Sequence, residues 1–185
     1  KTPYGQIVKN LRIDRILDEV YKLSDYKNRL RNISKFNLNQ KANNLPFRKG
    51  IALMPAKFGI SFNKPSLNQG GALVHVYSDG SIRLNHGGTE MGQGLFIKVA
   101  QVVAECFKVP LEQIHITSTN TAEVPNTSAT AASSGSDLNG MAAWNASNVI
   151  KNRMIEHAAK LFKKNKKDIV LGEGRIICGN RSLSF

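Results

Sequence analysis

Cysteine is scarce in this chain, with 2 residues in 185. Cys106 and Cys178 stand alone, without Cys-x-x-Cys spacing or a cluster of cysteine and histidine. The sequence therefore predicts no zinc or other metal site and no disulfide framework, and we expect two buried thiols. Long apolar runs are also missing. No stretch approaches the roughly 18 residues of a membrane span, and the first residues lack a signal-peptide core, so we expect a soluble, cytoplasmic protein.

Acidic residues are few, 13 against 26 Lys and Arg, which gives a net charge of +13. The excess lies in the flanks. Residues 1–50 carry 12 basic and 4 acidic side chains and residues 151–185 carry 9 and 3, whereas residues 51–150 carry 5 and 6. Lysine-rich blocks such as residues 163–167 are typical of solvated helix ends, and few aromatic residues accompany them for base stacking. An acidic neighbouring subunit explains the excess as well as nucleic acid does.

A basic nucleic-acid-binding module is nevertheless the alternative from a different class. Salt-dependent retention on duplex DNA would favour this alternative. The retention should then weaken when charge is removed at Lys163, Lys164, Lys166 and Lys167.

Residues 1–47 predict a helical segment from the preceding part of a longer subunit. Pro3 suits a first helical turn after Thr2. Apolar residues three and four positions apart mark a helix at Ile13, Ile16, Leu17, Val20 and Tyr21, and another at Tyr26, Leu30, Ile33 and Phe36. Ser24 and Asp25 are candidate caps of the second helix. We interpret these helices as packing elements.

Residues 48–185 predict an α+β fold. Strands are expected at residues 50–54 and 57–62, with Phe58 in the core, and a β-hairpin at residues 72–85 around Asp79-Gly80. A mostly buried helix follows Gly94, and a second, long helix covers residues 138–162. Between them we expect a short strand at 114–117 and a polar loop at 118–132. A small strand-turn-strand unit closes the chain at residues 169–180.

The stretch from His86 to Gly94 places four glycines directly after a strand and directly before a helix. Such a join exposes unpaired backbone N–H groups at a positive helix terminus, where they can hold an anion. A second join of this kind, residues 131–137, opens the next helix. We therefore expect the two helix starts, at Leu95 and Leu138, to face one cavity that holds a phosphate-bearing ligand.

The known nucleotide signatures do not explain these turns. There is no GxxxxGK[ST] motif, and Gly92-Gln93-Gly94 lacks the third glycine and the βαβ context of a dinucleotide site. The carboxamide of Gln93 can both donate to and accept from a heterocycle or an oxo group. A simpler alternative is that the glycines only permit tight turns and the serines of residues 133–136 only cap a helix.

Four segments together carry a family resemblance. They are residues 58–62 (Phe-Gly-Ile-Ser-Phe), the hairpin 71–85, Gly87-Gly88-Thr89-Glu90-Met91-Gly92-Gln93-Gly94, and residues 124–137 (Val-Pro-Asn-Thr-Ser-Ala-Thr-Ala-Ala-Ser-Ser-Gly-Ser-Asp). In this order and spacing they closely resemble the molybdenum-cofactor domain of xanthine dehydrogenases, most strongly over residues 50–145. The resemblance implies a fragment of a molybdenum-cofactor-binding domain, with N-terminal helices, a β-hairpin sheet and two buried helices.

The resemblance also implies site residues. Met91, Gly92 and Gln93 match the loop that contacts the pterin part of molybdopterin. The loop that binds the phosphate end is matched by Ala132, Ser133, Ser134, Gly135 and Ser136. Phe62 matches an aromatic residue that packs against the purine ring. Asn63 stands where better-known members carry Thr, so an amide contact to substrate replaces a hydroxyl contact.

The implied activity is oxidation of hypoxanthine and xanthine to urate by the molybdenum hydroxylase subunit. Electrons leave through 2Fe-2S clusters to FAD and NAD, so the implied partners are the iron-sulfur/FAD subunit and the remainder of the molybdenum subunit. The Gly-Glu-Pro-Pro stretch with the catalytic glutamate is missing, and Gly172-Glu173-Gly174-Arg175 is not that motif. We therefore expect no catalytic residue in this chain and no activity of the chain alone.

Two further expectations concern the titratable residues of the hairpin and glycine stretch, and the choice of enzyme within the superfamily. Glu90 is expected to stabilise its turn rather than to act as a base, and His75 and His86 to be hydrogen-bonded structural residues. An aldehyde oxidase-type enzyme or another N-heterocycle hydroxylase is the alternative within the superfamily. Exchange of Asn63 for Thr in the complete enzyme, with hypoxanthine and an aldehyde compared as substrates, would discriminate between them.

Overall fold

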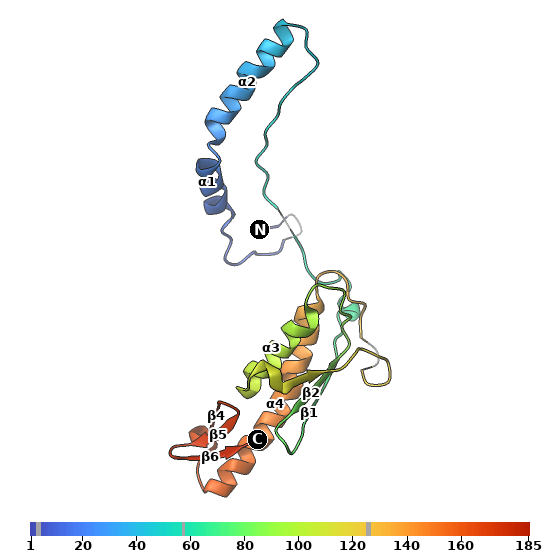
Figure 1. The fold of residues 1–185 in the computed structure, drawn as a ribbon, viewed down its shortest axis with the longest axis vertical. Helices are drawn as coiled ribbons and strands as arrows, with labels where there is room; N and C mark the ends of the chain where they lie inside the picture. Colours follow the sequence, from blue (N-terminus) through green and yellow to red (C-terminus); the bar gives the residue numbers. More distant parts are fainter. Residues whose placement is uncertain (3–4, 57, 125–126) are drawn as a thin grey trace. The chain divides into compact units, whose positions relative to one another are not determined.

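The computed structural model describes residues 1–2, 5–56, 58–124 and 127–185. They divide into two compact units, Lys1–Phe58 and Gly59–Phe185. The first unit contains helices α1 (Ile13–Leu23) and α2 (Tyr26–Ala42), which confirms the helical prediction for these residues (Figure 1). No residue of either helix is buried among the described residues. The division into domains at residue 47 stays a prediction.

The ends of these helices differ from the prediction. The helical start expected at Pro3 lies outside the described residues, and α1 begins at Ile13. Asp25 precedes α2, but its carboxylate accepts a hydrogen bond from Asn28 Nδ2 at 2.9 Å and none from a backbone N–H. The predicted backbone cap at Asp25 is therefore wrong.

The strands predicted at 50–54 and 57–62 are absent from the described part of this region. A strand requires a neighbour to hydrogen-bond with, and the structure places none beside these residues. Phe58 is 75% exposed, so its predicted place in the core is also wrong. The segment instead leads to a short 3-10 helix, η1 (Pro65–Leu67). Lys57 lies outside the described residues.

Strands β1 (Ala72–Val76) and β2 (Ile82–His86) form the predicted antiparallel hairpin, with Val74 opposite Leu84. The Asp79 carboxylate closes the turn, since it accepts hydrogen bonds from the Ser81 amide at 2.9 Å and the Ser81 hydroxyl at 2.7 Å. Gly80 has φ +83°, a conformation that glycine adopts without strain. The hairpin delivers the chain to the glycine stretch.

A βαβ unit follows the hairpin, contrary to the sequence prediction. β2 continues through α3 (Leu95–Phe107) and η2 (Leu111–Gln113) to β3 (Ile114–Ile116), which pairs with β2 in parallel. Only three residue pairs form this parallel ladder, so β3 is too short to show the periodicity of a parallel strand. The glycine stretch thus lies at the carboxyl end of a parallel strand, where open α/β sheets bind ligands.

Helix α4 (Gly135–Phe162) begins three residues before the predicted start and lies beside α3 (Figure 1). The two helices and one face of the sheet enclose the main core. Its most deeply buried members are Ile82, Leu84, Val99, Val103, Phe107 and Ala143. The helices and the two small sheets confirm the α+β class (Figure 1). Of the two helices predicted to be buried, α3 has 7 of its 13 residues buried, whereas α4 has only 7 of 28, so this prediction is wrong for most of α4.

The last segment forms an antiparallel sheet beyond η3 (Lys166–Asp168), with strands β4 (Val170–Gly172), β5 (Arg175–Cys178) and β6 (Arg181–Ser184) (Figure 1). β6 was not predicted. A smaller core joins this sheet to α4 through Ala158, Phe162, Ile169, Ile176 and Cys178. Cys106 and Cys178 are both free and buried, as predicted. None of the described helices has the length and apolarity needed to cross a membrane.

Candidate functional site

The glycine stretch begins with a buried histidine. His86 is 1% exposed, and its Nδ1 accepts a hydrogen bond from the Gly88 amide at 3.1 Å. Burial lowers the pKa of His86, opposed by the negative charge of Glu90, so the neutral ring that this bond requires is favoured. A Cβ on Gly88 would lie 2.5 Å from Leu95 Cδ2, so any larger residue here would require the buried Leu95 side chain to shift.

Glu90 fills the N-terminus of α3. Its Oε1 accepts hydrogen bonds from the amides of Gly92 at 2.8 Å and Gly94 at 3.0 Å, and its Oε2 accepts one from the Phe96 amide at 3.0 Å. These amides lower the pKa of Glu90, led by that of Phe96. The turn-stabilising role predicted for Glu90 is confirmed. The prediction that this turn offers free amides to an anion is wrong for Gly92, Gly94 and Phe96, because the carboxylate already takes their amides.

Gln93 is held within the same turn. Its Oε1 accepts a hydrogen bond from the Met91 amide at 2.6 Å, and its Nε2 donates to the Thr89 carbonyl at 2.9 Å. The carbonyl oxygen has a second lone pair and the amide a second hydrogen. One further acceptor and one further donor thus remain for a bound group.

The second join presents a different helix start. Ala132 and Ser133 both have φ +53°, a conformation that costs roughly 1–2 kcal/mol for a residue with a side chain. Ser134 is buried, and its hydroxyl donates to the Ala131 carbonyl at 3.0 Å. The amides of residues 135–137 have no acceptor among the described residues. The start of α4 therefore keeps the donors that an anion requires.

Three hydrogen bonds fix the two joins and a third segment to one another. The Thr89 amide donates to Thr130 Oγ1 at 2.8 Å, which connects the glycine stretch to the residue that directly precedes the second join. The Thr119 hydroxyl donates to the Gly88 carbonyl at 2.6 Å. The Ser61 amide donates to the Ala132 carbonyl at 2.9 Å. Segments distant in sequence are thus held in a fixed arrangement.

One cavity of about 470 Å³ lies between the starts of α3 and α4. Its described lining consists of Met91, Gln93, Leu95, Lys98, Thr130, Ala131, Ala132, Ser133, Gly135 and Ser136. The prediction that both helix starts face a common cavity is therefore confirmed. The volume falls in the range of small-molecule sites, and Lys98 adds a positive charge to the wall.

The sequence prediction captured most of this lining but not all of it. Of the predicted cofactor-binding residues, Gly92 and Ser134 do not line the cavity, because Gly92 supplies an amide to Glu90 and Ser134 is buried beneath the loop. Lys98, Thr130 and Ala131 were missed. Lys98 stands three residues after the start of α3, so helical spacing would have placed it on the same side as Leu95.

The predicted substrate residues lie outside this cavity. Phe62 is half-buried and Asn63 is exposed, and neither belongs to its described lining. Asn68 holds Phe62 by two bonds: the Phe62 amide donates to Asn68 Oδ1 at 2.8 Å, and Asn68 Nδ2 donates to the Phe62 carbonyl at 2.9 Å. These two bonds hold the backbone of Phe62, and the preceding residue, Ser61, is bound to the Ala132 carbonyl.

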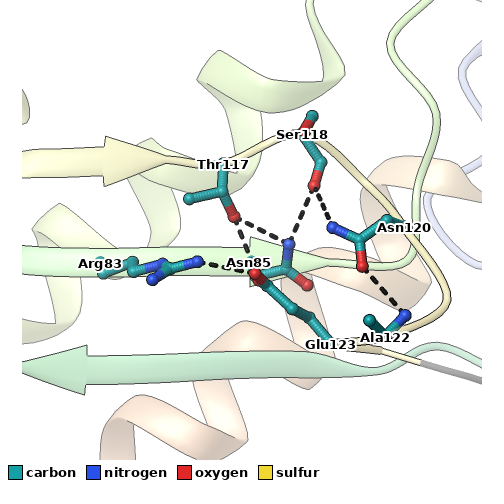
Figure 2. Close-up of polar contacts among 7 residues, drawn as sticks. All are labelled: Arg83, Asn85, Thr117, Ser118, Asn120, Ala122 and Glu123. Atoms are coloured by element: carbon teal, nitrogen blue, oxygen red, sulfur yellow. Dashed lines mark hydrogen bonds and ion pairs between the residues drawn. The ribbon is translucent and has the colours of Figure 1, made fainter.

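A polar network anchors the loop between β3 and the second join (Figure 2). Arg83 on β2 pairs with Glu123 at 2.7 Å, and Asn85 Nδ2 donates to Thr117 Oγ1 at 2.8 Å and the Ser118 carbonyl at 3.2 Å. The Ala122 amide donates to Asn120 Oδ1 at 2.9 Å. These bonds hold the long loop against the sheet before it turns toward the cavity. Pro125 and Asn126 lie outside the described residues.

The described lining of the cavity offers two kinds of polar group. Amides at the start of α4 and the charge of Lys98 suit a phosphate, whereas the carboxamide of Gln93 suits ring nitrogens and carbonyls. No group of three or more His, Cys, Asp or Glu side chains in the described part of the chain could hold a metal ion.

These features belong to a domain class that binds a pterin cofactor. The family model described as "Molybdopterin cofactor-binding domain" matches residues 19–185, and the chain belongs to this family.

Within the family, the chain is similar to xanthine dehydrogenases. It is 47% identical over 165 residues to xanthine dehydrogenase/oxidase of Rattus norvegicus, covering 89% of this chain and 12% of the relative. It is 48% identical over 153 residues to xanthine dehydrogenase of Dictyostelium discoideum, covering 83% and 11%. The chain thus spans about an eighth or less of the length of these relatives.

Solved structures share the fold. Quinoline 2-oxidoreductase from Pseudomonas putida 86 superposes with a TM-score of 0.68 at 15% identity, covering 97% of this chain and 23% of that chain. CO dehydrogenase from Oligotropha carboxidovorans gives 0.56 at 24% identity, covering 60% and 14%. At these identities the likeness shows the fold alone.

Proposed function

We propose that this chain is the part of a xanthine dehydrogenase that holds molybdopterin between the starts of α3 and α4. The observation that carries the proposal is the cavity shared by these two helix starts. The identity of nearly half of the aligned residues to xanthine dehydrogenases over most of the chain supports the choice of enzyme. The whole enzyme would oxidise hypoxanthine and xanthine to urate in the cytoplasm.

The two ends of the cavity would bind different parts of the cofactor. Amides of Gly135 and Ser136, with the hydroxyls of Ser133 and Ser136, would hold the phosphate end. Met91 would pack against the pterin and Gln93 would hydrogen-bond to its polar edge. When bound, the molybdenum centre supplies the hydroxylation chemistry, and the protein supplies orientation and charge. Gly92 and Ser134 would act through the shape of their loops.

The substrate would meet Phe62 and Asn63. The ring of Phe62 would pack against the flat face of a purine, and Asn63 would hydrogen-bond to its edge. The paired bonds from Asn68 hold the backbone that carries both residues. Electrons would leave through 2Fe-2S clusters, FAD and NAD in the other parts of the enzyme, which are the expected partners of this chain.

The complete enzyme that contains this segment provides the test. We expect it to purify with molybdenum and pterin in near-equal amounts and to form urate from xanthine. Replacement Phe62→Leu should raise KM for xanthine roughly two- to tenfold, since a ring stack contributes roughly 0.5–1.5 kcal/mol, and should leave pterin content unchanged. Replacement Phe58→Leu, at an exposed aromatic nearby in sequence, is the matched control. Purified enzyme without pterin would refute the proposal.

A further inference from the structure

The N-terminus of α3 differs from that of α4 in one respect, namely that it contains its own anion. The carboxylate of Glu90 accepts hydrogen bonds from Gly92, Gly94 and Phe96. Gly94 is the N-cap residue of α3 and Phe96 lies in its first turn, so their amides are donors that a bound phosphate would otherwise use at this helix start. The negative charge of Glu90 also offsets the positive end of the helix dipole.

The start of α4 has no such substitute. Among the described residues, the amides of Gly135, Ser136 and Asp137 find no acceptor. Asp137 lies in this first turn, but its carboxylate is exposed, forms no bond to these amides and is not part of the cavity lining. The two helix starts on one cavity are therefore unequal in charge and in donors.

Glu90 also sets the conformation of the turn. Gly92 and Gly94 have φ of +94° and +74°, and each donates its amide to the same oxygen of Glu90. Between them stands Gln93, whose side chain closes the opposite side of the turn through Met91 and Thr89. The place of the Gln93 carboxamide on the cavity wall thus depends on the carboxylate.

We infer that Glu90 is a positioning residue: it presents Met91 and Gln93 to the cavity and excludes a second phosphate from the start of α3. The ligand is thereby bound in one direction, with its phosphate at α4 and its heterocycle at α3. This inference rests on the proposed function. It gives Glu90 a role in the selection of a ligand orientation, which a residue that merely stabilises the turn would not have.

Competition with inorganic phosphate separates the two roles. Glu90→Gln preserves the size of the side chain and one acceptor oxygen, but removes the charge and leaves a positive helix start open to anions. In the complete enzyme, we expect this variant to lose pterin about tenfold faster during dialysis against phosphate than against chloride of equal ionic strength. Wild-type enzyme and Glu112→Gln, an exposed glutamate outside the cavity lining, should lose pterin equally slowly in both.

Glu90→Asp keeps the charge on a side chain one methylene shorter. Glu90→Asp should therefore lose pterin as slowly in phosphate as in chloride, although the shorter side chain holds the turn less well. This variant is the one to measure where Glu90→Gln does not accumulate as folded enzyme. Pterin loss from Glu90→Gln at the same rate in phosphate and chloride, or phosphate sensitivity of Glu90→Asp as great as that of Glu90→Gln, would overturn the inference. Wild-type enzyme that contains no pterin would overturn the proposed function instead, and the inference with it.

Discussion

A carboxylate placed at the start of α4 should act in opposite directions on the fold and on the ligand. Ser136 lies in the first turn of α4 and lines the cavity, among amides that have no protein acceptor in the described structure. The replacement Ser136→Asp adds a negative charge at a positive helix terminus. Such a charge stabilises a helix by about 0.3–1 kcal/mol, so the variant should be at least as stable as wild type.

The same charge would repel a phosphate held by these amides. Two unit charges about 4 Å apart repel by about 4 kcal/mol at an effective dielectric constant of about 20, which corresponds to a loss of several-hundred-fold in affinity. Ser136→Ala, which removes only the hydroxyl, should cost about 1 kcal/mol, or roughly fivefold. The order of pterin retention should therefore be wild type, then Ser136→Ala, then Ser136→Asp.

The assay is pterin content per protein in the complete enzyme, measured by fluorescence after oxidative release, together with the thermal unfolding midpoint. Ser184→Asp places the same charge on the exposed strand β6 and controls for net charge. Full pterin content in Ser136→Asp would refute the assignment of the phosphate to α4. A lower unfolding midpoint with loss of pterin would attribute that loss to misfolding.

Three other measurements test the structure. Replacement of the fully buried Phe107 by Ala should lower the protection of α3 amides against hydrogen exchange by about 3–5 kcal/mol, whereas Phe58→Ala should have little effect. Equal protection in the two variants would contradict the core assignment. Burial lowers the pKa of His86 below its ordinary 6.5, so the contribution of His86 to loop stability should be fully present above pH 6.5 and decline as the pH falls below it. Pterin retention of the wild-type enzyme should show this decline, and that of His86→Asn should not. Asn68→Asp keeps the acceptor for the Phe62 amide but removes the donor to the Phe62 carbonyl, and should raise KM for xanthine without changing pterin content; an unchanged KM would mean that Phe62 does not contact substrate.

The parts of the fold with strong local signals could be predicted from the sequence. Asp79-Gly80 between alternating apolar residues predicted the hairpin, and the apolar residues after Gly94 and over residues 138–162 predicted helices α3 and α4. The parallel pairing of β2 with β3 was missed because it depends on contacts across more than 25 residues of chain, which local patterns do not contain. Residues 50–54 form an apolar run and residues 57–62 partly alternate, as strands do, but a pattern does not supply the neighbouring strand that pairing requires.

At the site, the glycines indicated where a ligand could approach but not which amides were free. That depended on one side chain, Glu90, which turns back onto its own loop. The residues on both sides of it resemble an ordinary anion-binding turn. Ala132 and Ser133 gave no signal of their left-handed backbone, since neither is a residue type that favours it. Tertiary contacts such as Thr89 with Thr130 hold that loop in place.

The single main-chain bond from Ser61 to Ala132 has a practical consequence for engineering. Phe62 follows Ser61 directly, so the bond from Ser61 to Ala132 limits where the ring of Phe62 can lie. One extra residue between Ser61 and Phe62, with the Ser61 bond to Ala132 kept, would shift Phe62 by up to about 3.5 Å and break its two bonds to Asn68. An insertion at this point should therefore alter which substrates are accepted while the enzyme still carries its full complement of molybdopterin.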